Sequence, residues 1–252
     1  MQLATIGFGN AGGKIVDRLL EYERDRGRSL CRFAGAFNTA QIDLQKLEYI
    51  PEEYRILYGQ TDERAKGHGV GADPDLGAEV TRQDLGEIER VLDGIPLYDV
   101  DAFLLIAGLG GGTGSGGAPV VASKLAEMYD EPVYGLGILP GGDEGGRAAL
   151  NAGRSLRSFT EATNGLLLFD NEAWHEGTDS VAAGYERTNS EIAKRFANLL
   201  AAGVKEDGQV SENAMDASDI KRTLGAGGIS TVAYAEATVE GTTKSGQGLL
   251  GR

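Results

Sequence analysis

The sequence has few residues that could cross-link the chain or bind a metal ion. It contains 1 cysteine and 2 histidines among 252 residues. The lone Cys31 cannot form an internal disulfide, and His68 and His175 lack the spacing of metal ligands, so we expect no structural zinc site. No apolar stretch reaches the roughly 18 residues of a membrane span, and the N-terminus leads directly into an expected strand. These absences predict a cytoplasmic protein that does not insert into a membrane.

Basic residues, and lysine above all, are also scarce. The 24 Lys and Arg residues, of which 8 are lysines, are outnumbered by 38 Asp and Glu residues, and the formal charge is −14. Because nonspecific duplex binding depends on neutralising phosphates with Lys and Arg, we expect no nucleic-acid partner. Few lysines and many carboxylates are typical of proteins from salt-loving archaea, where high ionic strength screens the repulsion between like charges.

Glycine is abundant, with 39 residues, and 7 of them lie within residues 108–117. An apolar stretch at 100–107 precedes this run, and an apolar stripe with helical spacing at 118–129 follows it. The pattern predicts a strand, a glycine-rich loop and a helix in succession. Glycines let the backbone approach a ligand closely, and a helix that begins just beyond them directs free N–H groups at an anion. We therefore expect a phosphate-binding loop here.

A second glycine-rich turn, at 7–14, follows an expected strand at 3–7. Gly7, Gly9 and Gly12 match the dinucleotide-binding pattern G-x-G-x-x-G, so an NAD-dependent oxidoreductase is one alternative. That pattern expects an acidic residue at the end of the second strand, which binds the ribose. Here the expected second strand at 32–37 is followed by Asn38 and Thr39, so the alternative lacks its discriminating residue.

The sequence Gly-Gly-Gly-Thr-Gly-Ser-Gly at 110–116 resembles the signature phosphate loop of the tubulin/FtsZ superfamily. Other segments resemble that superfamily in the same order along the chain: the first glycine turn, a second glycine loop at 67–74, Glu144, Asp-Asn-Glu-Ala at 170–173, the Tyr-x-x-x-Asn spacing of Tyr185 and Asn189, and the acid spacing of Asp216 and Asp219. The whole pattern looks most like the archaeal CetZ branch. The resemblance covers residues 2 to about 238.

The resemblance implies that the chain binds GTP or GDP, with Mg²⁺ held through the nucleotide and without a metal site of its own. In the superfamily the matching glutamate approaches the ribose, the two asparagines read the base, and the tyrosine stacks on it. An alternative for Asn189 is a helix cap, because Thr188 and Glu191 have the spacing of a capping box. The implied nucleotide-binding residues are Gly9, Asn10, Ala11, Gly12, Gly13, Lys14, Gly69, Gly71, Ala72, Gly110, Gly111, Gly112, Thr113, Gly114, Glu144, Asn171, Tyr185 and Asn189.

The resemblance also implies that Asp216 and Asp219 catalyse GTP hydrolysis. These acids follow a long helix that begins at Tyr185, and a helix of about 17 residues spans roughly 25 Å. They therefore cannot reach their own nucleotide and would act on that of the next subunit in a head-to-tail protofilament. The expected function is that of a cytoskeletal GTPase that is active in the polymer and controls cell shape or surface organisation. The alternative is a GTP-binding scaffold that does not polymerise.

The expected fold is α/β. A Rossmann-like parallel-sheet GTPase domain at 1–184 is followed by a central helix at 185–203. Residues 204–252 would hold the catalytic loop, helix and first strand of a C-terminal α+β domain that is incomplete. Further strands are expected at 55–58, 132–139, 166–169 and 231–238, and further helices at 76–92 and 147–163.

Overall fold

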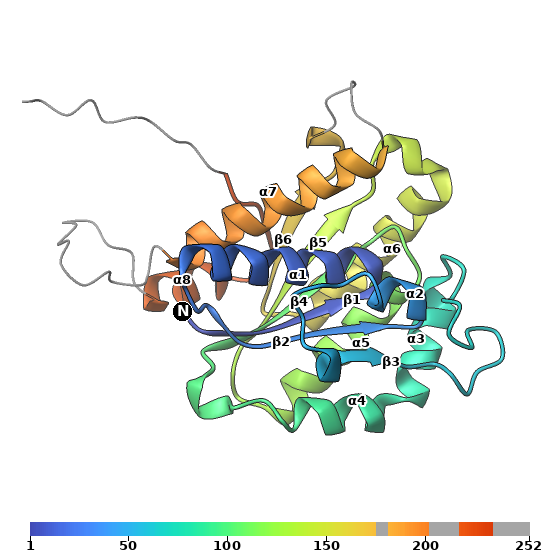
Figure 1. Cartoon of the computed structure of the whole chain (residues 1–252), viewed down its shortest axis with the longest axis horizontal. Coiled ribbons are helices and arrows are strands. Elements are labelled where there is room, and N and C mark those ends of the chain that lie inside the picture. Colours follow the sequence, from blue (N-terminus) through green and yellow to red (C-terminus); the bar gives the residue numbers. More distant parts are fainter. Residues whose placement is uncertain (175–180, 202–216, 234–252) are drawn as a thin grey trace, which may run out of the picture.

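The computed structural model of the protein describes residues 1–174, 181–201 and 217–233. Within these residues, seven strands form one parallel sheet in the order β3-β2-β1-β4-β5-β6-β7 (Figure 1). The strands are β1 (Leu3–Phe8), β2 (Cys31–Asn38), β3 (Arg55–Leu57), β4 (Ala102–Gly108), β5 (Val133–Leu139), β6 (Gly165–Asp170) and β7 (Ile229–Ser230). The expected Rossmann-like parallel sheet is confirmed, whereas the division into domains at 184 and 203 stays a prediction.

Helices cover both faces of the sheet, and each face has its own apolar cluster. One face carries α1 (Gly9–Arg26), α2 (Gln41–Leu44), α7 (Val181–Ala201) and α8 (Ala217–Leu224), and the other carries α3 (Pro74–Gln83), α4 (Leu85–Leu92), α5 (Thr113–Met128) and α6 (Gly145–Ala162) (Figure 1). Because both faces are covered, the central strands are apolar along their length, as the β4 sequence AFLLIAG shows. None of the helices described here has the length and apolar character needed to cross a membrane.

Two expected helices have different bounds in the structure. The helix expected at 76–92 is divided into α3 and α4 at Asp84, whose carboxylate accepts a hydrogen bond from the amide of Gly59 at 2.5 Å. The helix expected at 118–129 begins earlier, at Thr113, inside the glycine run. Glycines are poor helix formers. Their low helix propensity is the reason that the first turn of α5 was not expected from the sequence.

Two expectations near the C-terminal end are also wrong in their bounds. Helix α7 begins at Val181, so that Tyr185 lies one turn inside the helix and not at its start. The strand expected at 231–238 is absent at 231–233, and the short strand β7 precedes it at Ile229–Ser230. Residues 234–238 lie outside the described part of the chain.

The sheet has its topological switch point between β1 and β4, which are neighbours in register from Leu3–Ala102 to Phe8–Ala107. From β1 the strand order runs to β2 and β3 on one side and to β4, β5 and β6 on the other. In open parallel sheets, ligands bind in the crevice beyond the carboxyl ends of the strands at such a point. The two glycine-rich segments after β1 and β4 therefore lie side by side where a ligand is expected.

Candidate functional site

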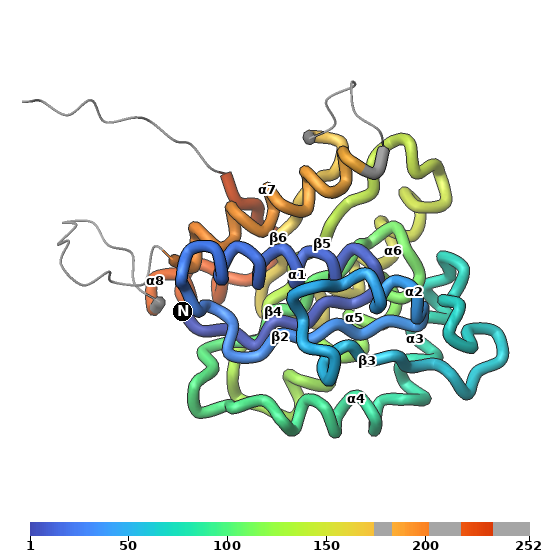
Figure 2. Tube along the Cα trace, viewed as in Figure 1, coloured from blue at the N-terminus to red at the C-terminus, as the bar shows by residue number. Residues whose placement is uncertain are grey.

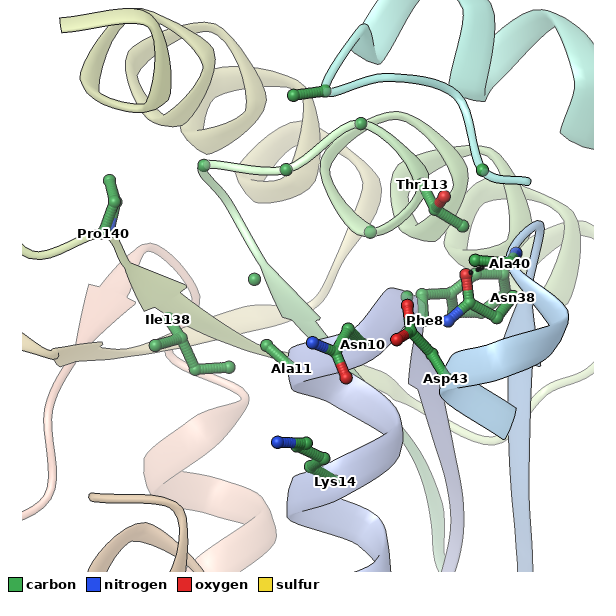
Figure 3. Close-up of a pocket in the computed structure, with 18 of the residues that line it drawn as sticks. Phe8, Asn10, Ala11, Lys14, Asn38, Ala40, Asp43, Thr113, Ile138 and Pro140 are labelled. Carbon is green, nitrogen blue, oxygen red and sulfur yellow. Dashed lines mark hydrogen bonds between the residues drawn. The ribbon is translucent and has the colours of Figure 1, made fainter. Parts of the chain in front are cut away.

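A cavity of about 780 Å³ opens at the carboxyl ends of the strands (Figure 3). Sixteen of the eighteen residues predicted to bind a nucleotide line this cavity. They come from the first turns of α1 and α5, from the loop before α3, from the loop after β5, from Asn171 after β6, and from α7. The structure thus brings together segments that are up to 180 positions apart, from Gly9 to Asn189.

One end of the cavity is built from the N-termini of α1 and α5. Gly9, Asn10 and Ala11 line it from α1, and Gly110 to Gly114 line it from the segment that enters α5. Neither helix carries an acidic residue in its first turn. The free N–H groups and positive dipole ends of both helices are therefore available to an anion.

A third loop closes this end. Gly69, Gly71 and Ala72 line the cavity, and the amide of Gly69 donates to the carbonyl of Thr39 at 3.0 Å. The hydroxyl of Thr39 lies 2.6 Å from that of Thr113, so the loop after β2 is bonded to both neighbouring loops. The anion-binding end is consequently held in place by bonds between loops.

The other end of the cavity contains Asn171, Tyr185 and Asn189. Asn171 and Asn189 are only 8% and 6% exposed, and the Oδ1 atom of Asn171 has no hydrogen-bond partner among the described residues. A buried amide oxygen without a partner is costly, so it is a strong indication of a ligand that donates a hydrogen bond there. Tyr185 and Asn189 lie one turn apart on α7 and face the same cavity.

The capping alternative for Asn189 is excluded. Because α7 begins at Val181, both Thr188 and Asn189 lie well inside the helix. The Thr188 hydroxyl donates to the carbonyl of Gly184 at 3.0 Å, as an interior helical threonine does. Asn189 therefore does not cap the helix.

Glu144 lines the cavity from the segment after β5. One of its carboxylate oxygens accepts a hydrogen bond from the amide of Gly141 at 3.0 Å. Burial, the negative charge of Glu144 and a hydrogen bond to that carboxylate together raise the pKa of Tyr185 to about 12. The phenol is thus protonated at neutral pH and can donate to Glu144.

Four predicted residues lie outside the cavity or outside the described chain. Gly12 and Gly13 do not line it, and Gly12 serves packing, because a Cβ atom there would overlap the carbonyl oxygen of Ile106. Asp219 is exposed on α8 at the opposite edge of the sheet. Helix α8 is attached there by Lys221, whose Nζ atom donates to Asp101, just before β4, at 2.7 Å. Asp216 lies outside the described residues.

Ten lining residues were not predicted. They are Phe8, Asn38, Ala40, Asp43, His68, Val70, Gly108, Ile138, Pro140 and Glu186. Asn38 could have been found, since it ends a strand at the ligand edge of the sheet. Among the residues that the structure describes, no group of three or more His, Cys, Asp or Glu side chains could hold a metal ion. A cation in this cavity would need ligands from a bound phosphate as well.

Comparison with known proteins agrees with this geometry. Residues 2–179 match the model of the Tubulin/FtsZ family GTPase domain, and residues 178–252 match that of the tubulin-like CetZ C-terminal domain. The tubulin-like protein CetZ1 of Haloferax volcanii is 53% identical over 253 residues, covering 100% of this chain and 64% of that protein. The chain thus spans less than two thirds of this relative's length.

Two solved structures from the same organism are also similar. CetZ1 as a GDP-bound monomer superposes with a TM-score of 0.84 at 50% identity, covering 91% of this chain and 66% of the other. CetZ2 in a GTPγS-bound protofilament superposes with a TM-score of 0.82 at 44% identity, covering 91% of this chain and 64% of the other.

Proposed function

Because this chain belongs to the Tubulin/FtsZ family, on its CetZ branch, we propose that it binds GTP and GDP, hydrolyses GTP and assembles head to tail into protofilaments. The proposal extends to a cytoplasmic role in cell shape or surface organisation. The nucleotide-bound and protofilament forms of its relatives support binding and assembly.

The observation that carries nucleotide binding is the buried, unpartnered Oδ1 atom of Asn171, in a cavity that also holds two helix N-termini. Guanine carries an amino group that donates hydrogen bonds, and an amide oxygen accepts them. At the other end, the helix N-termini suit phosphates. A cavity of about 780 Å³ lies within the usual range for small-molecule sites.

Hydrolysis would use the glycine loops for charge stabilisation. Their backbone N–H groups are fixed before the reaction and can stabilise the charge that develops on the phosphoryl oxygens. Mg²⁺, when bound with the nucleotide, neutralises phosphate charge. Asp43, which lies beside Asn38 and Phe8 (Figure 3), is the acidic lining residue on this side that could hold the ion together with phosphate oxygens.

The position of Asp219 supports catalysis between subunits. Its helix is bonded to the residue before β4, whereas the cavity lies beyond the other end of that strand. A strand of seven residues is about 23 Å long, so Asp219 cannot contact a nucleotide in its own subunit. A head-to-tail contact would bring Asp219, and with it Asp216, to the nucleotide of the next subunit, and a contact of this kind that does not close generates a filament.

The first test is to purify the protein in high salt, release any bound small molecule with acid, and identify it by chromatography and mass. Recovery of GDP or GTP supports the proposal. Recovery of NAD(H) would instead favour the oxidoreductase alternative and overturn the proposal.

The second test concerns shared catalysis. A protein that carries Asp219→Ala is mixed with a protein whose loop at 110–112 can no longer bind nucleotide, and GTP hydrolysis is measured under assembling conditions. Partial recovery of hydrolysis is expected, because each partner supplies what the other lacks. No recovery would contradict catalysis between subunits, and a wild-type mass that stays monomeric at all concentrations with intact GTP would identify a non-polymerising scaffold.

A further inference from the structure

An ion pair joins α1 to α7 at the wall of the cavity. The Nζ atom of Lys14 lies 2.9 Å from Oε1 of Glu186, and both residues line the cavity. The second carboxylate oxygen of Glu186 lies 3.8 Å from Nε of Arg18, one turn further along α1. Helices α1 and α7 pack against each other, and Figure 2 shows α7 crossing α1 at an angle. Glu186 thus lies within ion-pair distance of two cations of α1, with Lys14 the nearer of the two.

Lys14 lies away from the anion-binding end of the cavity. It follows Asn10 by four residues, which places it about 6 Å further along the axis of α1. In Figure 3 its side chain extends on the far side of Asn10 from the glycine segment that leads to Thr113. Its partner Glu186 directly follows Tyr185 on α7 and precedes Asn189 by three residues. Lys14 therefore belongs to the end of the cavity that contains Asn171.

The two polar groups at this end are complementary to guanine and not to adenine. A lysine ammonium has three donors and no acceptor, and only one of the three is directed at Glu186. Guanine has an acceptor oxygen at position 6, where adenine has a donor amino group, and lysine commonly donates to that oxygen in nucleic-acid recognition. The unpartnered Oδ1 atom of Asn171 supplies an acceptor for the guanine amino group.

We propose that Lys14 donates to the 6-oxo group of guanine and that Glu186 is the positioning residue that holds the Lys14 ammonium there. The inference rests on the proposed function and names what selects the base. Lysine has a long flexible side chain that could otherwise follow the negative phosphates. The ion pair to Glu186 keeps the ammonium at the base.

The test compares two ligands that differ at position 6. GTP is compared with the triphosphate of 2-aminopurine riboside, which keeps the amino group and lacks the 6-oxo oxygen together with the N1 proton, and the dissociation constants of wild type and Lys14 variants are measured by calorimetry so that the contribution of Lys14 is separated from that of N1. The wild-type protein is expected to bind GTP about 10- to 100-fold more tightly, the usual effect of a hydrogen bond to a charged group. Lys14→Met should lose the part of the preference that the contact to the 6-oxo group supplies, about tenfold or more, and keep only what the N1 proton of guanine contributes, whereas Lys14→Arg should keep the full preference.

Glu186→Gln tests the positioning role. It should lose part of the preference for GTP, about three- to tenfold, while its affinity for the 2-aminopurine ligand stays near that of the wild type. Glu191→Gln is the matched control, because Glu191 pairs with Arg195 on the same helix at 3.8 Å and does not line the cavity. Glu191→Gln should retain the full preference.

The outcomes separate the inference from the proposed function. If Glu186→Gln weakens both ligands equally, its role is only structural and the inference is overturned. The same holds if wild-type protein binds both ligands equally. If the wild-type protein binds no guanine nucleotide at all, the proposed function itself fails. Unfolding curves of each variant show whether a loss of affinity reflects a loss of fold.

Discussion

The Nδ2 atom of Asn151 lies 3.0 Å from the carbonyl oxygen of Ala72, and so joins α6 to the loop before α3. The same nitrogen donates to the carbonyl of Gly110 at 3.1 Å. Asn151 is 4% exposed and Gly110 is buried as well, whereas Ala72 is exposed, so the bond to Gly110 is the one that bulk water cannot replace. One buried amide therefore ties together two of the loops that line the anion-binding end of the cavity.

Replacing Asn151 with alanine should loosen both loops. Two carbonyl groups, of which that of Gly110 is buried, would lose their donor, which should lower the free energy of unfolding by about 1–3 kcal/mol. The dissociation constant for GTP should rise as well, because the loops would no longer be held in the binding geometry. Urea unfolding and calorimetric titration measure the two effects.

Asn198→Ala is the matched control for this variant. Asn198 accepts a hydrogen bond from Tyr22 at 2.6 Å and does not line the cavity, so its loss should lower stability and leave GTP affinity unchanged. If Asn151→Ala also left GTP affinity unchanged, the bonds to Ala72 and Gly110 would have no part in positioning the loops.

Substitution of two glycines of the predicted site should affect different properties, namely stability at Gly12 and nucleotide binding at Gly111. A Cβ atom at Gly12 would overlap the carbonyl oxygen of Ile106, so Gly12→Ala should lower the free energy of unfolding by about 1–3 kcal/mol or more. A Cβ atom at Gly111 would meet nothing within 4 Å, so Gly111→Ala should change stability by less than about 0.5 kcal/mol. Gly111→Ala should nevertheless weaken nucleotide binding, because its methyl group would occupy cavity space.

Unfolding curves and the nucleotide content of the purified variants check this pair. Retention of full nucleotide content by Gly111→Ala would show that Gly111 does not approach the ligand. An unchanged stability of Gly12→Ala would mean that α1 can move away from β4 at no cost.

Six of the seven described strands could be predicted from the sequence, because most of them are apolar runs between turn residues, whereas the two-residue strand β7 could not. The β4 sequence AFLLIAG can be read in this way without knowledge of its neighbours. The start of α5 could not, because Thr113 to Gly117 has low helix propensity and becomes helical through tertiary packing. Gly116 packs so closely on the backbone of α3 at Pro74 that a side chain would not fit.

Site residues that belong to a sequence motif could be predicted. Site residues that are defined by a single contact between distant segments could not. The glycine segments and both asparagines follow from motifs, and the structure places them in one cavity. Glu186 and Asn151 have no motif, because their contacts to Lys14 and Ala72 depend on how helices far apart in sequence pack. Such residues become visible only once the fold is known.

The ion pair that holds α8 should make stability depend on pH. Burial alone would raise the pKa of Asp101, but hydrogen bonds from Lys221 and from the amide of Gln2 lower it below its ordinary value. A carboxylate with a lowered pKa stabilises the fold above its unfolded pKa of about 3.9, and this stability is lost as the pH falls through the folded pKa.

Asp101→Asn should therefore be less stable than wild type at pH 7, by about 0.5–1 kcal/mol because the pair is partly exposed to solvent. The difference should shrink as the pH falls below about 4, where Asp101 takes up a proton. Urea unfolding between neutral and acidic pH measures the difference. A gap that stays constant over this range would show that the charge of Asp101 does not contribute.

The unpartnered oxygen of Asn171 gives the sharpest test of base recognition. If it accepts a hydrogen bond from the guanine amino group, the wild-type protein should bind GTP more tightly than ITP, which lacks that group. The expected difference is about tenfold, as for one net hydrogen bond in a buried site. Asn171→Ala should bind both ligands with the weaker affinity, because the acceptor is gone, while Asn198→Ala should discriminate as the wild type does. A variant Asn171→Ala that still preferred GTP over ITP would show that another group reads the amino group, and the buried oxygen would then need a different partner.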